Sequence, residues 1–437
     1  MKRKLLLLAL IPMLLTGCDF EPDSLGEDLS SIVSIQGKGE VYYPQEFTLK
    51  NDCLDQPSDV FNKDLALFTY GASVANKTKD TIITFYRDMM FSTLEVSSNY
   101  DITPTKDTIA YTIGSRMMNH SKVVLVSVRG FNYGAEWGSN FDLGLEGDHV
   151  GFTKAANTLI GDLDDYIKTY QHQNSKIILT GYSRGGAVAN VAAKILFERE
   201  KKLVRDENFY VYTFEAPKGC LEYHDYKNVF NIVNRYDLVP MIAPLEYGFY
   251  RVGQDIYIDQ ENVREICLNY DPSIVIPEFT EFDYDTGPVT QESLPQTLIY
   301  MLTQPIYGEQ SIDTREKFVN VICDTLDYVF TIFMTLDSET LSKIGEGASE
   351  KSLFELLGII TDPDALVSFL TPYLDEGGFV YDADELMFYA SKLTTFIGYG
   401  PGIMVVLMYG VYGDDFSSMI YMHYPEVNYP LLEALCI

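Results

Sequence analysis

A serine between two glycines, at the end of an apolar run, is the first feature that could do chemistry. Residues 176–180 are mainly apolar, and residues 181–185 read Gly-Tyr-Ser-Arg-Gly, which fits the pattern G-x-S-x-G. Apolar residues at helical spacing follow from Ala187 onward. Strand, tight turn and helix in this order would hold the hydroxyl of Ser183 out at the end of a sheet, and the glycines would leave room for the strained turn. Ser183 is therefore the candidate nucleophile.

Several blocks around this serine resemble the class 3 lipases, an α/β-hydrolase family. Residues 180–186 resemble the signature T-G-H-S-x-G-G. Further blocks follow in the family's order: 123–130 resembles a strand ending in F-R-G-T, 136–152 resembles D-W…N/D-L followed by H-x-G-F, 212–217 resembles Y-T-F-G-x-P, and 234–240 resembles N-x-x-D-x-V-P. The resemblance covers about residues 120–245 and a short C-terminal piece. It implies an α/β-hydrolase fold and a serine hydrolase that needs neither a cofactor nor a metal.

A serine hydroxyl needs a general base, and the base needs a carboxylate that orients it. The resemblance implies that Asp237 is this acid, because it stands at the aspartate of N-x-x-D-x-V-P, and Asp225 is the nearest alternative. The chain order in this fold is Ser, Asp, His. His423 is the only one of the five histidines that follows Asp237, and residues 423–427 resemble the H-x-P-E-V piece that carries the family's base. The predicted triad is therefore Ser183, Asp237 and His423.

The negative charge that develops on the attacked carbonyl oxygen needs two preorganised donors. The backbone N–H of Arg184, directly after the nucleophile, is expected to be one of them. The second is expected from the loop after the strand at 122–128, at Gly130 or Phe131. The family usually has Ser or Thr where Phe131 stands, so Asn132 is a candidate substitute for the missing hydroxyl. Tyr182 and Glu215 replace the family's His and Gly. Little effect is expected from Tyr182, because its side chain would face away from the substrate in such a turn.

The first residues have the pattern of a processing segment. A basic start is followed by a short apolar run and then by Leu-Thr-Gly-Cys at residues 15–18, which resembles the lipobox of bacterial lipoproteins. The resemblance implies that Cys18 is lipidated and that the protein is anchored to a membrane outside the cytoplasm. An ordinary secretory signal that is cleaved elsewhere is the alternative. Residues 19–31 are acidic and contain proline and glycine, so they are expected to form a flexible tether.

Composition limits the possible partners. The chain has a net charge of −31, which argues against nucleic acid as a partner because that interaction needs a basic face. The 46% of hydrophobic residues suffice for a sizeable core. The five cysteines beyond Cys18 are scattered without a C-x-x-C pair, so we expect buried thiols and neither a zinc site nor a disulfide framework.

Apolar runs at 122–128, 176–180, 209–214 and 229–233 are predicted strands, residues 107–113 alternate like a strand, and residues 247–253 are a candidate edge strand. Helical candidates later in the chain include residues 294–302 and 314–335. Strands that alternate with helices predict an α/β-hydrolase sandwich with a mainly parallel central sheet. The predicted division is a signal at 1–18, a tether and N-terminal segment at 19–45, a hydrolase core at 46–270, a helical insertion at 271–400, and a C-terminal part of the core at 401–437. The insertion is expected to be either a cap over the site or a buttress away from it.

Two functions follow from these patterns. The first is a serine hydrolase that cleaves carboxylic esters, with lipid acyl esters as the expected substrates. The second is a non-catalytic binding or structural lipoprotein that has retained the fold, since a fold does not determine a function. The order of Ser183, Asp237 and His423 along the chain favours the enzyme. The oligomeric state is left open.

Overall fold

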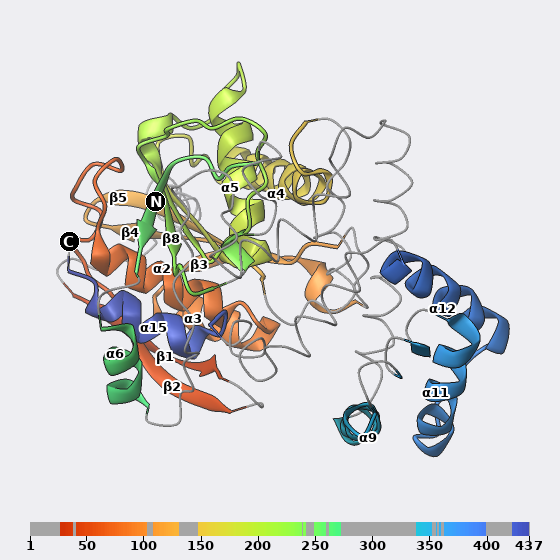
Figure 1. Cartoon of the computed structure of the whole chain (residues 1–437). Coiled ribbons are helices and arrows are strands. Elements are labelled where there is room, and N and C mark those ends of the chain that lie inside the picture. The colour runs from red at the N-terminus through yellow and green to blue at the C-terminus, as the bar shows by residue number, and fades with distance from the viewer. Residues whose placement is uncertain are drawn as a thin grey trace, which may run out of the picture.

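The structure is a computed structural model of the whole chain (Figure 1). It describes residues 27–37, 41–102, 108–130, 147–237, 239–241, 249–258, 262–271, 338–351, 355, 358–359, 362–398 and 422–436. The predicted lipidation site Cys18 and the predicted oxyanion-hole residue Phe131 lie outside these residues, as do the helical candidates at 294–302 and 314–335.

A seven-stranded sheet with the order β3-β4-β5-β6-β7-β8-β9 forms the centre of the fold. Its strands are β3 (Ser92–Val96), β4 (Tyr111–Met118), β5 (Ser121–Val128), β6 (Lys176–Tyr182), β7 (Phe209–Phe214), β8 (Val229–Val233) and β9 (Gln254–Tyr257). From β5 to β9 every neighbouring pair is parallel, whereas β3, β4 and β5 pair antiparallel. The predicted α/β sandwich with a mainly parallel sheet is confirmed.

The parallel strands are buried on both faces, and their side chains alternate between two cores. In β6, Ile178 and Tyr182 enter one core, and Ile177 and Leu179 enter the other. Strands covered on both faces have no solvated side, which is why they read as continuous apolar runs in the sequence. For this reason β7 and β8 have the bounds that the sequence predicts.

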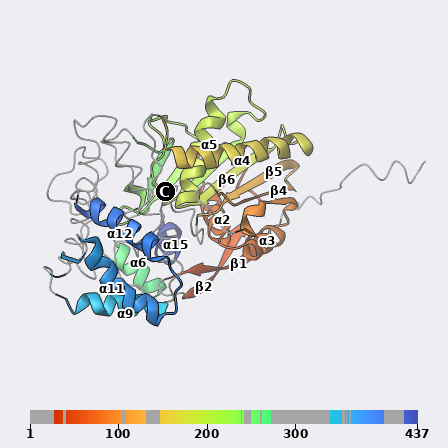
Figure 2. The ribbon, with the colours of Figure 1, turned by 90° about the vertical axis from the view of Figure 1, so that its right-hand side faces the viewer.

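Helices cover both faces of the sheet, as Figures 1 and 2 show. The helices α4 (Val150–Thr169) and α5 (Arg184–Glu198) pack on one face. Residues of α2 (Lys63–Ala75), α3 (Lys79–Asp88), α6 (Val263–Tyr270) and α15 (Pro425–Ala434) pack on the other. The C-terminal helix α15 thus belongs to the same body as the elements at the beginning of the chain.

An N-terminal hairpin extends the core beyond the predicted boundary. The strands β1 (Leu29–Gln36) and β2 (Tyr42–Leu49) pair antiparallel, and Val33, Ile35 and Phe47 are buried in the core with α2 and α3. The predicted tether at 19–31 therefore extends too far at its end, and the predicted boundary at residue 46 falls inside β2. The hairpin escaped prediction because only alternate residues of β1 are buried, so the apolar signal is diluted.

Two edge elements differ from the sequence prediction. A strand was expected at 107–113, but β4 occupies Tyr111–Met118. Residues 247–253 are a candidate edge strand in the sequence, yet the described part of this stretch contributes only an isolated bridge between Tyr250 and Cys220. Gly253 has φ +92°, and a Cβ atom there would lie 2.4 Å from the carbonyl oxygen of Val229, so the chain turns at this glycine before β9 begins.

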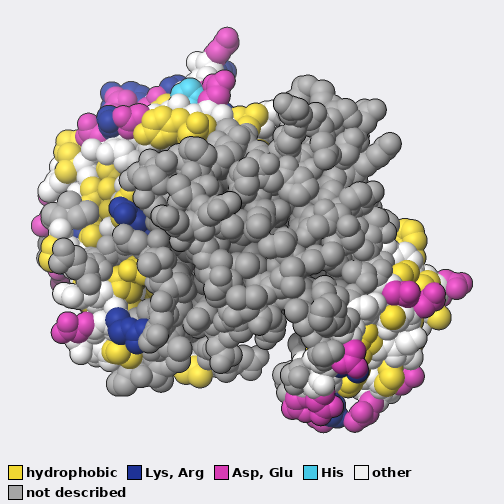
Figure 3. All heavy atoms as spheres, viewed as in Figure 1, with side chains coloured by type: hydrophobic (Ala, Val, Ile, Leu, Met, Phe, Trp, Pro, Cys, Tyr) yellow, Lys and Arg dark blue, Asp and Glu magenta, His cyan; other side chains and the backbone are white. Residues whose placement is uncertain are grey.

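The described part of the predicted insertion contains the helices α9 (Ser338–Ser349), α11 (Pro363–Glu376) and α12 (Ala383–Gly398). They have a small core of their own around Leu374 and Leu386. Acidic side chains gather on the visible face of this group in the space-filling view (Figure 3). In the part of the chain that the structure describes, no helix has the length and apolar character needed to cross a membrane.

The cysteines in the described ranges are free thiols. Cys53, Cys220 and Cys267 are buried, and burial raises the pKa of the Cys53 and Cys267 thiols to about 12. Such thiols stay protonated and behave as small apolar side chains. Cys436 is exposed, contrary to the expectation that the thiols are buried, and Cys323 lies outside the described residues.

Candidate active site

Ser183 occupies a strained turn between β6 and α5. Its backbone has φ 54° and ψ −128°, a conformation that costs energy for a residue with a Cβ atom. The turn is held because the N–H of Ser183 donates to the carbonyl of Phe214, at the end of β7, over 2.8 Å. The predicted strand, turn and helix are therefore all present, and the serine lies where β6 meets α5.

The glycines around the serine allow the close backbone contacts that the turn requires. A Cβ atom on Gly181 would lie 2.3 Å from the carbonyl oxygen of Gly185, and one on Gly185 would lie 2.4 Å from that of Val128. A Cβ atom on Gly130 would lie only 1.7 Å from the carbonyl oxygen of Tyr182. Because each clash is with backbone, any larger residue would move the strand ends that shape the site.

The three predicted triad residues lie in one chain of hydrogen bonds. His423 Nε2 lies 2.8 Å from Ser183 Oγ, and His423 Nδ1 lies 2.5 Å from Asp237 Oδ2. The side chain of Asp237 is fully buried, whereas that of His423 is 15% exposed. A buried carboxylate on Nδ1 leaves Nε2 free to accept a proton from the serine, which is the geometry that nucleophilic catalysis needs.

The loop after β8 positions the aspartate. The N–H of Asp237 donates to the carbonyl of Asn234 over 3.0 Å, and Asp237 Oδ1 accepts from the N–H of Val239 over 2.8 Å. One oxygen thus closes the turn and the other faces the imidazole. The alternative acid, Asp225, lies at the surface and pairs with Lys227. It is not brought to His423.

A buried polar network holds the loop that carries His423. The hydroxyl of Tyr182 donates to the carbonyl of His423 over 2.9 Å. Asn428 Nδ2 in turn donates to that hydroxyl over 2.8 Å and to the carbonyl of Met422 over 3.0 Å. Asn234 Nδ2 donates to Asn428 Oδ1 over 2.8 Å, which ties the His423 loop to the Asp237 loop. Sequence reasoning missed these supports, and it assigned Tyr182 little effect.

The elements expected to form the oxyanion hole meet at the same place. Arg184 is the first residue of α5, so its N–H lies at a helix N-terminus, where amide groups favour negative charge. Its guanidinium is buried and donates to the carbonyl of Thr108 over 3.2 Å. The predicted role in the oxyanion hole belongs to the backbone N–H of Arg184 and does not involve this side chain. Gly130 lies against the turn, while Phe131 and Asn132 are outside the described residues. The oxyanion-hole assignments remain predictions.

Two of the other histidines, His149 and His224, have roles away from the triad. His149 caps α4, because its Nδ1 accepts from the N–H of Phe152 over 3.3 Å and its ring stacks on Phe152. His224 lies at the surface with Nε2 at 3.3 Å from Glu198 Oε1. Neither contact set involves Ser183.

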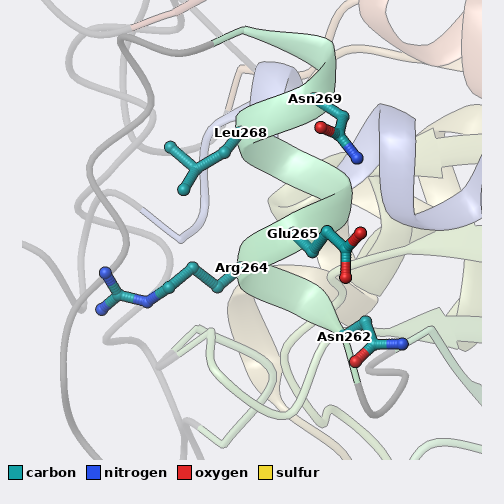
Figure 4. A pocket seen from close by; sticks show the side chains of 5 residues that line it. All are labelled: Asn262, Arg264, Glu265, Leu268 and Asn269. Atoms are coloured by element: carbon teal, nitrogen blue, oxygen red, sulfur yellow. The ribbon is translucent and has the colours of Figure 1, made fainter.

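One shallow pocket among the described residues lies at α6, away from the triad. Asn262, Arg264, Glu265, Leu268 and Asn269 line it. In Figure 4, Arg264 and Leu268 point to one side of the helix, and the other three point away from them. These side chains do not converge on a common point, so we assign no chemistry to this pocket. Within the described ranges, His, Cys, Asp and Glu form no group that could hold a metal ion.

Comparison with known proteins agrees with the resemblance seen in the sequence. The family described as Lipase (class 3) matches residues 125–247. A lipase of Rhizomucor miehei is 32% identical over 133 residues, which cover 28% of this chain and 36% of that protein. A secreted mono- and diacylglycerol lipase 1 of Fusarium solani is 26% identical over 159 residues, which cover 32% of this chain and 45% of that protein.

The similarity to solved structures also covers only part of this chain. The solved structure of the Rhizomucor miehei triacylglyceride lipase aligns with 44% of this chain and 78% of its own, at 21% identity and a TM-score of 0.33. The chain spans less than half the length of the curated relatives named above. The predicted resemblance to the class 3 lipases is confirmed. The matched region contains Ser183 and Asp237 but ends well before His423.

Proposed function

We propose that this protein is a serine hydrolase that cleaves carboxylic esters, with lipid acyl esters as its substrate class. The observation that carries the proposal is the hydrogen-bonded order Ser183 Oγ, His423 Nε2 and Asp237, with 2.8 Å between the first two atoms. The match of residues 125–247 to a lipase family supports the choice of esters over other acyl compounds.

The proposed reaction proceeds in two halves. Ser183 Oγ attacks the ester carbonyl while His423 Nε2 takes its proton, and Asp237 stabilises the imidazolium that results. The N–H of Arg184 and an N–H at Gly130 or Phe131 bind the oxyanion of the tetrahedral intermediate. His423 then protonates the leaving alcohol, which departs and leaves an acyl group on Ser183. In the second half, water activated by His423 releases the carboxylic acid and restores the serine.

Hydrolysis by the purified protein tests this proposal. We expect release of p-nitrophenol from p-nitrophenyl esters and of fatty acid from emulsified acylglycerols, with a burst of the first product if acyl-enzyme hydrolysis is slow. Peptide amides of matched size serve as the comparison substrates. Absence of turnover on esters of every chain length, with the protein folded, would contradict the proposal and favour a non-catalytic binding protein.

We also propose that Cys18 carries a lipid anchor that holds the protein on a membrane outside the cytoplasm. The support is the lipobox-like sequence at residues 15–18 after a short apolar run. Several acyl chains on one cysteine would give stable attachment, since each buried CH₂ group adds about 0.8 kcal/mol.

Substitution Cys18→Ala is expected to abolish this attachment and move the protein from the membrane fraction to the soluble fraction. Metabolic labelling with a palmitate analogue measures it, with Cys436→Ala as the control because that thiol is exposed in the folded protein. Label retained by the Cys18→Ala protein would rule the anchor out.

The helices α9, α11 and α12 are proposed to form a cap that limits substrate size. Two observations support this proposal: the helices share a small core of their own, and they lie in the chain between Asp237 and His423. Replacing residues 338–398 with a short flexible linker is expected to change the preference among acyl chain lengths more than it changes thermal stability. An unchanged chain-length profile, together with a large drop in Tm, would identify the insertion as a structural buttress.

A further inference from the structure

A second buried carboxyl group lies beside the triad, and the reaction outlined above does not use it. Glu215 directly follows β7, is 1% exposed and has φ +46°, a left-handed conformation that is costly for a residue with a side chain. The class 3 lipases have glycine at this position of Y-T-F-G-x-P, and glycine adopts such a φ without strain. This chain therefore keeps a carboxyl group at a place where the backbone disfavours any side chain.

The hydrogen bonds of Glu215 join β7 to the loop of the catalytic acid. Both carboxyl oxygens accept from the N–H of Asn234, over 3.0 Å and 3.2 Å. The Glu215 carboxyl group also lies within hydrogen-bonding reach of the Asp237 side chain. The backbone N–H of Glu215 donates to the carbonyl of Ile232 in β8 over 3.0 Å, so its main chain is fixed as well.

A hydrogen bond between two carboxyl groups requires one proton between them, because an ionised carboxylate has no donor. Asp237 already accepts from the N–H of Val239 at Oδ1 and faces His423 Nδ1 with Oδ2. Both of its oxygens therefore already face N–H donors, whereas the two Glu215 oxygens share the single N–H of Asn234. The proton between the two groups therefore belongs to Glu215.

The surroundings of Glu215 favour the protonated form. Burial is the largest cause that raises the pKa of Glu215 well above its usual range, followed by the charge of Asp237. The N–H of Asn234 and the Arg251 guanidinium oppose this shift. Arg251 is committed elsewhere, because its Nη1 donates to the carbonyls of Ala216 and Pro240, over 3.0 Å and 2.7 Å, and its Nε donates to Asp255 over 3.2 Å.

Two further titratable groups face this carboxyl. The buried phenols of Tyr70 in α2 and Tyr182 in β6 interact electrostatically with Glu215, and burial raises the pKa of both phenols well above their ordinary value. Both therefore stay neutral at physiological pH. Among the described groups with the largest effect on the pKa of Glu215, Arg251 is a cation and Asp237 is an anion.

We infer that Glu215 is a positioning residue: it is uncharged in the folded protein and donates its proton to Asp237, which fixes that carboxylate against His423 without adding a second negative charge. This inference rests on the proposed function for its kinetic consequences, but the position of the proton is independent of activity. Together the two carboxyl groups carry one negative charge. This charge balances the one positive charge of the imidazolium that forms on His423.

Two substitutions at Glu215 distinguish a role in positioning Asp237 from a role in packing alone. Gln in Glu215→Gln can donate an N–H to Asp237 and accept from Asn234 with its oxygen, so we expect kcat within a few-fold of the unsubstituted protein. Glu215→Gly removes the hydrogen bond and relieves the positive φ, and we expect kcat to fall about 10- to 100-fold because a hydrogen bond to a charged group is lost. Glu198→Gln, at the protein surface, is the control.

The pH profile of kcat/KM tests the charge of Glu215. If Glu215 is neutral, Glu215→Gln leaves the acidic limb, set by His423, where it is in the unsubstituted protein. If Glu215 were ionised, the substitution would remove an anion near the imidazole and shift that limb toward lower pH by about one unit or more. Such a shift, or an unchanged kcat in Glu215→Gly, would overturn the inference.

Infrared difference spectroscopy tests the proton directly and needs no turnover. The spectrum of the unsubstituted protein minus that of Glu215→Gln, recorded at neutral pH, should contain the C=O stretch of one protonated carboxylic acid. A carboxylate band in its place would overturn the inference even if the protein hydrolyses esters. A protonated band in a protein that hydrolyses nothing would leave Glu215 neutral and would contradict the proposed function alone.

Discussion

Ser183→Ala is expected to lower kcat for ester hydrolysis by about a millionfold, the loss that follows when a catalytic serine is removed from a triad. The reason is that Ser183 Oγ, 2.8 Å from His423 Nε2, is the atom that would form the acyl-enzyme. Alanine also lacks the hydroxyl without adding volume, so the strained turn stays intact. Initial rates on a p-nitrophenyl ester measure the effect.

Ser58→Ala is the matched control for this prediction. Ser58 is similarly buried, and its hydroxyl donates to the carbonyl of Glu207 near the start of β7, at the opposite end of the sheet. We expect this variant to keep its activity and to lose only a little stability. Undiminished turnover by folded Ser183→Ala protein would remove Ser183 from the mechanism.

His423→Ala is expected to reduce kcat nearly as much as Ser183→Ala does. Without the imidazole, nothing takes the proton from the hydroxyl of Ser183, 2.8 Å away, and an alkyl hydroxyl is a weak nucleophile at neutral pH. The double variant is expected to be little worse than either single variant, because residues that act as a unit are not additive. The three proteins are compared under the same conditions, with near-UV circular dichroism as the check of folding.

His224→Ala provides the control for the histidine. Its side chain is partly exposed and lies near Glu198 and Glu222, so removing it should leave turnover unchanged. A His423→Ala protein with undiminished turnover would show that the base is misassigned. Complete loss of turnover in a folded His224→Ala protein would lead to the same conclusion.

The sequence predicts the centre of the sheet better than its edges. The strands β7 and β8 have the predicted bounds because strands covered on both faces read as mainly apolar runs, and polar residues bound both runs. The β1–β2 hairpin and the true position of β4 are less visible. In β1 every second residue faces outward, and β4 begins at Tyr111, four residues after the predicted start.

Only part of the site could be predicted, because some of the residues that meet there lie far apart in the sequence. The turn around Ser183 is encoded by adjacent residues, so its strand, glycines and helix could be foreseen. The network of Tyr182, Asn428 and Asn234 could not, because Asn428 and Tyr182 are 246 positions apart and no spacing rule connects them. Glu215 was visible only as a departure from glycine, and its contact with Asp237 became visible in the folded structure.

The placement of His423 depends on the whole fold. The match to the lipase family ends at residue 247, so it does not include His423. A long connection between the loops of Asp237 and His423 costs little, because the entropy of loop closure grows only with the logarithm of length. Packing of α15 against α6 and α2 places His423 beside the carboxyl ends of the strands.

Labelling with a fluorophosphonate tests the central claim most directly, because such probes react only with a serine that a neighbouring base has activated. The protein is incubated with the probe, digested and analysed by mass spectrometry to locate the modified residue. The account predicts one adduct, on Ser183, formed in the unsubstituted protein and lost in both Ser183→Ala and His423→Ala. An adduct on another serine, or an unlabelled Ser183 in folded protein that still hydrolyses esters, would contradict it.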